Sequence, residues 1–450
     1  MPRTDVTEFM KDSRLGRVHI SVALLCGITL LADGYDVGIL GAVIPALTKS
    51  WHISHTAAGL LGSAGLAGML FGGIGLGTVA DRIGRKPSLI VSLAVFGVCA
   101  GLSAAASGPV VFDVLRFCAG LGLGGALPLT ATLSAEYAPR RWRSSFVMWT
   151  SIGYATGALL AAAVSRAAIG SWGWRGVILT GAFPLLLVPV LALFLPESLE
   201  WLVRGGRTDR ARRIMAAVAG PGRVAADAEL YAAPSADRVP MVRLFERRYV
   251  LRTVLLAFAF SGCLLMLYAI LTWLPTLVAK SGLSVAGGLT MLILLNGGGV
   301  VGIVINGALA GRVAVSRIVL GSYACVAVSL IVLGFAHSDL TIGMLAFLAG
   351  MFAYGSSVAE NAYSTLVYPD ELRGTGTGWC LGIGRVGAIA GPYLGGALLD
   401  HEVPLKLAYL VFAAAGVVSL AAVTIVQRHR TGGGTHGTIA AGAALGPVEP

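Results

Sequence analysis

Twelve stretches of this 450-residue chain are apolar over about 20 residues or more, and this pattern excludes an ordinary soluble fold. A helix of about 20 apolar residues crosses a hydrocarbon layer about 30 Å thick. Only 12% of the residues are charged, and 62 are glycines, which permit close helix packing in lipid. The sequence therefore predicts an all-α polytopic membrane protein. The predicted spans are 18–47, 56–80, 87–106, 110–138, 144–168, 176–195, 251–279, 285–311, 316–336, 340–369, 374–399 and 405–427.

Basic residues are concentrated on one side of these predicted spans. Of the 33 Lys and Arg residues, 26 fall in the connections of one side and 5 in those of the other. Cytoplasmic connections carry such an excess. We therefore expect a multi-pass protein of the inner (plasma) membrane with both termini in the cytoplasm. The net charge of +11 then requires no nucleic-acid partner.

The two halves of the chain are related by a shift of 230 residues. The shift superimposes the pairs Pro45 and Pro275, Pro139 and Pro369, Arg143 and Arg373, and Trp149 and Trp379. The predicted parts are a cytoplasmic N-terminus (1–17), a six-helix half (18–195), a cytoplasmic linker (196–250), a second six-helix half (251–427) and a disordered cytoplasmic tail (428–450). An amphipathic helix is expected within the linker, around Thr208–Val218.

The first span contains Asp33-Gly34-Tyr35-Asp36, in which two carboxylates interrupt an apolar run. Each unpaired charge would cost about 2.5 kcal/mol or more at the centre of a bilayer. Residues three apart share a helix face, so Asp33 and Asp36 are predicted to line one polar cavity. The 230-residue shift gives neither aspartate an acidic counterpart, which favours a function specific to the first half.

Three further charged residues lie inside spans and also lack a charged counterpart in the repeat: Arg116, Arg385 and Glu360. A guanidinium in a membrane needs a carboxylate, carbonyl groups or an anionic ligand. Arg116 and Arg385 are therefore candidates for binding an anionic substrate, with structural ion pairs or snorkelling as the alternative. Glu360, beside Asn361, is a candidate ligand or proton site, or a structural residue.

The connection between the second and third spans combines one acid, three bases and two glycines. Such a turn can hold helix ends together in one conformation and release them in another. Glu136, near the end of the fourth span, is expected to pair with local arginines, and Arg312 stands in the corresponding connection of the second half. We call this set the gating loop: Gly77, Asp81, Arg82, Gly84, Arg85, Lys86, Glu136 and Arg312.

Several separate motifs resemble the aromatic acid–proton symporter family of the major facilitator superfamily. They are DGYD at 33–36, DRIGRK at 81–86, the glycine helix after Arg116, EYAPRRWR at 136–143 and GIGRVGAIAGP at 382–392. The resemblance implies the major facilitator fold of two six-helix pseudo-repeats. It also implies proton-coupled uptake of benzoate-like or hydroxybenzoate acids by alternating access. Where the family has an acid after the eighth span, this chain has Gly311-Arg312, so the role of its second loop is left open.

An aromatic carboxylate needs a cation and an apolar slot with aromatic surfaces. The sequence offers Tyr35, Tyr268, Trp273 and Tyr354 for those surfaces. In the mechanism we expect, a proton on Asp33 or Asp36 favours binding of the anion from outside. The two halves then rock, and the proton leaves on the cytoplasmic side.

Other functions remain as alternatives at this stage: a sugar, polyol or other metabolite transporter, an exporter of the same fold, or a sensor. Sugars are held mainly by amide and hydroxyl groups, and this chain has one glutamine and three asparagines. An enzyme is not expected, because no nucleophile–base pair is apparent. We expect no cofactor other than the proton gradient, no metal, six unpaired cysteines and a monomer.

Overall fold

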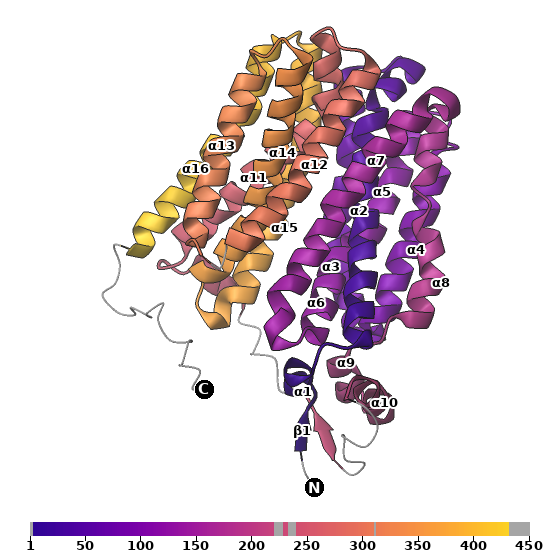
Figure 1. The fold of residues 1–450 in the computed structure, drawn as a ribbon, viewed down its shortest axis with the longest axis vertical. Coiled ribbons are helices and arrows are strands. Elements are labelled where there is room, and N and C mark those ends of the chain that lie inside the picture. Colours follow the sequence, from indigo (N-terminus) through magenta and orange to yellow (C-terminus); the bar gives the residue numbers. More distant parts are fainter. Residues whose placement is uncertain (1–2, 220–227, 233–239, 310–311, 432–450) are drawn as a thin grey trace, which may run out of the picture.

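The computed structural model describes residues 3–219, 228–232, 240–309 and 312–431. Two helical bundles stand side by side, each formed by one half of the chain (Figure 1). The first half contains α2 (Arg17–Trp51), α3 (His55–Ile83), α4 (Arg85–Ser103), α5 (Pro109–Gly124), α6 (Ala126–Tyr137), η1 (Arg140–Trp142), α7 (Arg143–Thr180) and α8 (Pro184–Phe194). The second half contains α11 (Val250–Lys280), α12 (Val285–Leu309), α13 (Val315–Leu333), α14 (Asp339–Val367), α15 (Asp370–Asp400) and α16 (Leu405–Thr431).

Ten helices among the described residues are long and apolar enough to cross a membrane. One of them, Met148–Phe194, has 47 residues and would be about 70 Å long if straight, which is twice what a bilayer needs. Gly173, with a φ of 62°, breaks it into two crossings. The helix α15 has 31 residues, and Arg385, Pro392 and six glycines within residues 382–399 make its central part less hydrophobic than the ten. Counting both gives the predicted twelve crossings.

The two halves repeat the same helix packing, which confirms the 230-residue shift. In the first half, Gly68 of α3 lies against the carbonyl oxygen of Phe117 in α5. In the second half, Gly298 of α12 lies against the carbonyl oxygen of Phe347 in α14. The same correspondence links Gly72–Leu121 with Gly302–Met351, and Gly120–Gly65 with Gly350–Leu295. Glycine at these positions lets the backbones touch, which is a common way to pack helices in lipid.

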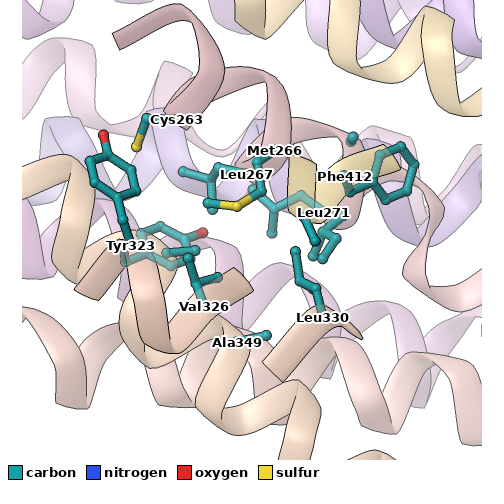
Figure 2. Close-up of a cluster of buried hydrophobic side chains, with 14 of the residues drawn as sticks. Cys263, Met266, Leu267, Leu271, Tyr323, Val326, Leu330, Ala349 and Phe412 are labelled. Carbon is teal, nitrogen blue, oxygen red and sulfur yellow. The ribbon is translucent and has the colours of Figure 1, made fainter. Parts of the chain in front are cut away.

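Each half has its own apolar core. The core of the second half gathers around α11, where Cys263 and Met266 face Tyr323, Val326 and other apolar side chains (Figure 2). Cys263 and Met266 occupy the repeat positions of Asp33 and Asp36, and both are almost fully buried. The second half therefore has neutral side chains at these two helix positions, and its own buried acid, Glu360 of α14, is bonded to Tyr323 in this core.

The N-terminal segment and the linker form a small structure beneath the first half (Figure 1). It consists of β1 (Arg3–Asp5), α1 (Val6–Asp12), α9 (Leu199–Arg204), α10 (Thr208–Ala219) and β2 (Glu229–Tyr231), whereas η2 (Met241–Phe245) packs against α11 and α15 of the second half. Strand β1 pairs in parallel with β2. The predicted linker helix is confirmed as α10, which buries Ala211 and Met215, whereas the ordered N-terminus was not predicted. The helix α16 continues to Thr431, so residues 428–431 of the predicted tail are helical. Residues 432–450 lie outside the described residues.

The chain begins and α16 ends at the same end of the molecule, which we call the terminal end (Figure 1). The hydrogen bonds that we describe between the halves lie from the middle of the helices to the opposite end. At the opposite end, Asp400 of α15 accepts hydrogen bonds from the backbone of His55 (2.8 Å) and Thr56 (2.7 Å) at the start of α3. Near it, Ser63 donates to the carbonyl oxygen of Ile389 (2.6 Å). The opposite end is therefore closed.

Candidate functional site

Asp36 and Arg116 form a buried ion pair inside the first half. Arg116 donates two hydrogen bonds to the Asp36 carboxylate, at 2.6 and 2.5 Å, and its side chain is only 3% exposed. This fork is the strongest geometry that a guanidinium forms with a carboxylate. In this conformation Asp36 occupies both terminal nitrogens of Arg116, so binding of the substrate by Arg116 stays a prediction that requires this ion pair to open.

Asp113, one turn before Arg116 on α5, was not singled out from the sequence. Its Oδ1 is buried without a hydrogen-bond partner among the described residues, and so is Nε of Arg116. The charges of the two side chains interact. Arg116 therefore has a second acid within reach if its bond to Asp36 is lost.

Asp33 is buried and lacks an ion-pair partner of this kind. It is 2% exposed, and its Oδ1 has no hydrogen-bond partner among the described residues. The charges that act on the Asp33 carboxyl group are those of Arg385, from the second half, and Asp36, on its own helix. Gly34, the next residue, lies directly against the backbone of Tyr154, and a side chain there would collide. The acidic motif therefore combines a polar face with a tight packing position.

Arg385 crosses from the second half to the first. Its Nη1 donates to the carbonyl oxygen of Met69 on α3 at 2.7 Å, and the side chain is partly buried. A single bond to a neutral carbonyl oxygen leaves the other donors of the guanidinium available for an anion. The structure thus keeps Arg385, rather than Arg116, in a position to receive a carboxylate.

Tyrosines from both halves meet beside Asp33. The hydroxyl groups of Tyr154 (α7) and Tyr268 (α11) are 2.8 Å apart, and both side chains are within electrostatic range of Asp33. Tyr354 of α14 donates to Oδ1 of Asn296 at 2.8 Å, and its ring centroid is 6.2 Å from that of Tyr154. Tyr268 and Tyr354 were predicted, whereas Tyr154 and Asn296 were missed. The sequence offered a weak signal for Tyr154, which is a lone aromatic residue in a Gly- and Ala-rich run.

Two predicted aromatic residues lie elsewhere. Tyr35 bonds through its hydroxyl to Thr180 (2.8 Å) and packs edge-on against Phe183, inside the first half. Trp273 is fully buried near the opposite end, where its indole donates to the carbonyl oxygen of Pro392 (2.7 Å). Contact of these two side chains with the substrate therefore stays a prediction. In this conformation Tyr35 packs in the core of the first half, and the ring centroid of Trp273 lies 6.0 Å from that of His55 in the first half.

Glu360 lies in the core of the second half rather than between the halves. It is fully buried and accepts a hydrogen bond from Tyr323 at 2.6 Å, while its other oxygen has no partner among the described residues. This position separates it from the tyrosines at the boundary of the halves, so direct contact with substrate is not favoured. Asn361 is partly buried, and its carbonyl oxygen accepts from Ser364 at 2.8 Å.

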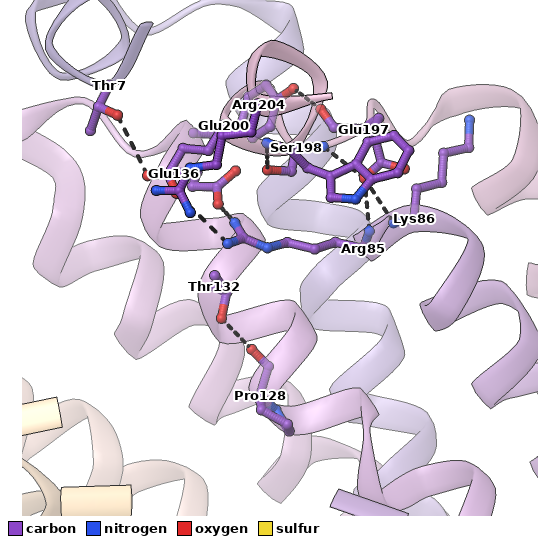
Figure 3. Close-up of polar contacts among 12 residues, drawn as sticks. Thr7, Arg85, Lys86, Pro128, Thr132, Glu136, Glu197, Ser198, Glu200 and Arg204 are labelled. Carbon is purple, nitrogen blue, oxygen red and sulfur yellow. Dashed lines mark hydrogen bonds and ion pairs between the residues drawn. The ribbon is translucent and has the colours of Figure 1, made fainter. Parts of the chain in front are cut away.

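Residues of the gating loop contact the linker and the end of α6 (Figure 3). Arg85 contacts Glu136 directly, as the sequence predicted for Glu136, and reaches Glu200 of α9 at 3.8 Å. The carboxylate of Glu197 accepts the backbone N–H groups of Arg85 (2.9 Å) and Lys86 (3.1 Å) at the start of α4. A carboxylate at a helix N-terminus is stabilised by these free donors and by the helix dipole.

The remaining members of the gating loop are more varied. Gly84 has a φ of 107°, a conformation that favours glycine, and closes the turn between α3 and α4. Gly77 has open space around it, and Arg82 and Arg312 are exposed. The carbonyl oxygen of Asp81 accepts from the indole of Trp201 in the linker at 3.2 Å. The gating-loop contacts described here stay within the first half and the linker. Gly311 lies outside the described residues.

Asp400, the last residue of α15, lies beyond the apolar part of that helix. In addition to the backbone bonds, its carboxylate lies 2.9 Å from Nδ1 of His55. Desolvation alone would raise the pKa of this carboxyl, but the hydrogen bonds from Thr56 and His55 together hold it well below its ordinary value. The closed end therefore keeps an ionised carboxylate as a bridge between the halves.

Comparisons with known proteins agree with this architecture. The profile of the family described as "Sugar (and other) transporter" matches residues 22–429. The chain is 32% identical to a benzoate transport protein of Acinetobacter baylyi over 95% of this chain and 93% of the relative. It is 35% identical to a gallate transporter of Pseudomonas putida (90% and 91% covered) and 35% identical to a 4-hydroxybenzoate transporter of the same species (88% and 89% covered).

A solved structure of a xylose transporter from E. coli superimposes with a TM-score of 0.68 at 18% identity, covering 90% of this chain and 96% of that one. That likeness establishes the fold alone. The family profile and these relatives place the chain among the transporters of the major facilitator superfamily. The chain belongs to the sugar (and other) transporter family within it, and its relatives include the aromatic-acid transporters whose motifs the sequence resembled.

Proposed function

We propose that this protein imports small aromatic carboxylates of the benzoate and hydroxybenzoate class, coupled to protons, across the inner membrane. Its termini lie in the cytoplasm, it works as a monomer and it uses no cofactor beyond the proton gradient. The observation that carries the proposal is a buried Asp33 carboxylate oxygen without a hydrogen-bond partner among the described residues of the first half, together with Arg385 of the second half, which reaches across to Met69.

Asp33 and a bound carboxylate would compete for the positive charge of Arg385. While Asp33 is ionised, an incoming anion meets its repulsion in a low-dielectric site. Once Asp33 takes up a proton, the available donors of Arg385 attract the substrate. Binding of proton and binding of substrate are then mutually favourable, which is the requirement for symport.

The ion pair of Asp36 and Arg116 has a second role in the proposed transport cycle, because it can open when Asp36 takes up a proton. Its charges are satisfied within the first half, so it does not need the substrate. A proton on Asp36 would free Arg116, which then has Asp113 within reach. We assign the transported proton to Asp33 and a supporting role to Asp36.

The direction of opening follows from the contacts between α3 and α15. Towards the terminal end, Gly75 and Gly77 of α3, and Gly374 and Gly378 of α15, have no atom within 4 Å of the place where a side chain would begin. The opposite end is closed by Asp400. With the basic connections on the cytoplasmic side, this conformation faces inward, as expected for substrate release after import.

The substrate class rests on two supports. The relatives at 32–35% identity are a benzoate, a gallate and a 4-hydroxybenzoate transporter. In addition, the aromatic rings of Tyr154, Tyr268 and Tyr354 come together near Arg385 and Asp33, which suits an aromatic anion.

The test is uptake of labelled benzoate, 4-hydroxybenzoate and a sugar by cells, with and without a protonophore. We expect the wild type to accumulate the aromatic acids and to lose accumulation with the protonophore. Asp33→Asn should retain exchange of the aromatic acid but not accumulate it, while Asp339→Asn, an exposed acid on α14, should behave as wild type. Sugar uptake, or aromatic-acid accumulation indifferent to both the protonophore and Asp33→Asn, would refute the proposal.

A further inference from the structure

The hydroxyl groups of Tyr154 and Tyr268 form the one tyrosine–tyrosine hydrogen bond that we describe across the two halves. Tyr154 belongs to α7 in the first half and Tyr268 to α11 in the second. Both side chains are partly buried.

The pair leaves hydrogen-bonding capacity unused. Two tyrosine hydroxyls carry two donors and four acceptor sites. Their mutual bond uses one donor and one acceptor site, so one O–H and three lone-pair sites remain. A third hydroxyl group placed beside them can therefore donate to one tyrosine and accept from the other. A plain C–H at the same place can do neither.

The position of the pair fits the far end of an aromatic acid. Tyr268 lies within electrostatic range of Arg385, the cation that remains available for a carboxylate. The ring of Tyr354 stands 6.2 Å from that of Tyr154 at an angle of 57°, which provides an aromatic wall beside the hydroxyl pair. The Tyr354 hydroxyl is itself occupied by Asn296. A substrate whose carboxylate is bound at Arg385 would thus present the opposite edge of its ring to the two tyrosine hydroxyls, which still have free hydrogen-bonding sites.

We propose that Tyr154 and Tyr268 together determine specificity for a ring hydroxyl group on the substrate, so that hydroxylated benzoates are preferred over benzoate. The inference rests on the proposed function, because it assigns the substituent recognised at that same site. Since the two tyrosines come from opposite halves, a bridging substrate hydroxyl also links them across the boundary.

The expected preference is moderate. A neutral hydrogen bond contributes about two- to twelve-fold in binding, and the tyrosine pair satisfies itself in part when benzoate is bound. We therefore expect Tyr154→Phe and Tyr268→Phe each to lower the ratio of uptake efficiency (kcat/KM) for 4-hydroxybenzoate over benzoate by about two- to twelve-fold. The double variant should lose little more than either single variant, because both remove one shared arrangement.

The matched controls are Tyr35→Phe, whose hydroxyl bonds to Thr180 inside the first half, and Tyr393→Phe, whose side chain is exposed on α15. Both should leave the ratio near the wild-type value. Uptake of benzoate by each variant shows whether it is folded and active. If a variant transports neither acid, displacement of a bound aromatic acid from the purified protein by the two compounds supplies the same ratio.

The outcomes separate the two proposals. A lower ratio in Tyr154→Phe and Tyr268→Phe, with the controls unchanged, supports the inference. An unchanged ratio in those variants, or an equal fall in Tyr35→Phe, overturns the inference and leaves the proposed function standing. A wild type that takes up neither aromatic acid refutes the proposed function, and this inference with it.

Discussion

Removing the charge of Asp36 should destabilise the fold much more than removing the charge of Asp33, although the two residues lie one turn apart on α2. Asp36→Asn leaves the Arg116 guanidinium, 3% exposed, without its carboxylate, and its Nε already lacks a partner. Stranding one member of a buried ion pair costs about 3–5 kcal/mol. The asparagine oxygen can still accept one bond, and Asp113 offers partial compensation, so we expect about 3 kcal/mol.

Asp33→Asn removes a buried carboxylate that has no bidentate partner. A buried charge without such a partner is itself unfavourable, so its replacement by a neutral amide should change the free energy of unfolding by less than about 1 kcal/mol. The two isosteric substitutions should therefore differ by about 2 kcal/mol or more. That difference comes from the environment of each side chain and not from the chemistry of the substitution.

The assay is unfolding of the purified protein in mixed micelles with increasing dodecyl sulfate, followed by helicity. Asp36→Asn should shift the midpoint to clearly lower denaturant than Asp33→Asn does. The double variant Asp36→Asn/Arg116→Gln should recover much of the loss, because removal of both charges leaves none stranded. Equal midpoints for the two single variants, or a double variant worse than both, would refute the reasoning.

Three further predictions test the packing and the ends of the helices. Gly34→Ala should destabilise the fold by about 1–3 kcal/mol because its methyl group meets the backbone of Tyr154, whereas Gly77→Ala, with open space, should be neutral within about 0.5 kcal/mol in the same unfolding assay. Glu197→Gln should weaken the attachment of the linker to the start of α4. Limited proteolysis should then cleave the linker faster than in the wild type and leave the membrane-spanning helices uncut. The pKa of Asp400 is lowered in the folded protein, so its contribution to closure is present above the ordinary pKa of a carboxyl group and is lost only as the pH falls through the lower folded pKa. Distances between spin labels on α3 and α15 should therefore stay constant from pH 8 to 5 in the wild type. In Asp400→Asn the same distances should be longer.

The repeat was the part of the fold that the sequence predicted most securely. Because the same backbone contacts are needed in both halves, the shift that aligned Gly68 with Gly298 also aligns their partners, Phe117 and Phe347. Conversely, charged residues without a counterpart, such as Asp33 and Arg385, do lie at the boundary of the halves or interact with it. Glu360, held inside the second half by Tyr323, is an exception, and so are Arg116 and Asp36, which pair inside the first half.

The sequence could not supply partners on different helices, about which a linear sequence carries little information. Arg116 could be recognised as needing an anion, but nothing in the chain distinguished Asp36 from a substrate as that anion. The orientation of Tyr35 was predictable: a helix turns about 100° per residue, so Tyr35 points away from the face of Asp33. Tyr154 was missed because its importance depends on Tyr268, which is 114 residues away.

The N-terminal strand was missed for a different reason. Strands β1 and β2 have three residues each, too few for any periodic pattern, and their pairing joins Arg3 to Glu229 across most of the first half. Such short strands are formed by the tertiary context rather than by local preference.

The central claim is that Asp33 couples proton movement to aromatic-acid movement. Its most direct test is to reconstitute the protein into liposomes that contain a pH-sensitive dye and to add benzoate or 4-hydroxybenzoate outside without a pH gradient. The account predicts that either acid drives acidification of the lumen by the wild type and that Asp33→Asn exchanges the labelled acid without acidification. Acidification by Asp33→Asn at the wild-type rate, or acid uptake by the wild type without proton movement, would contradict it.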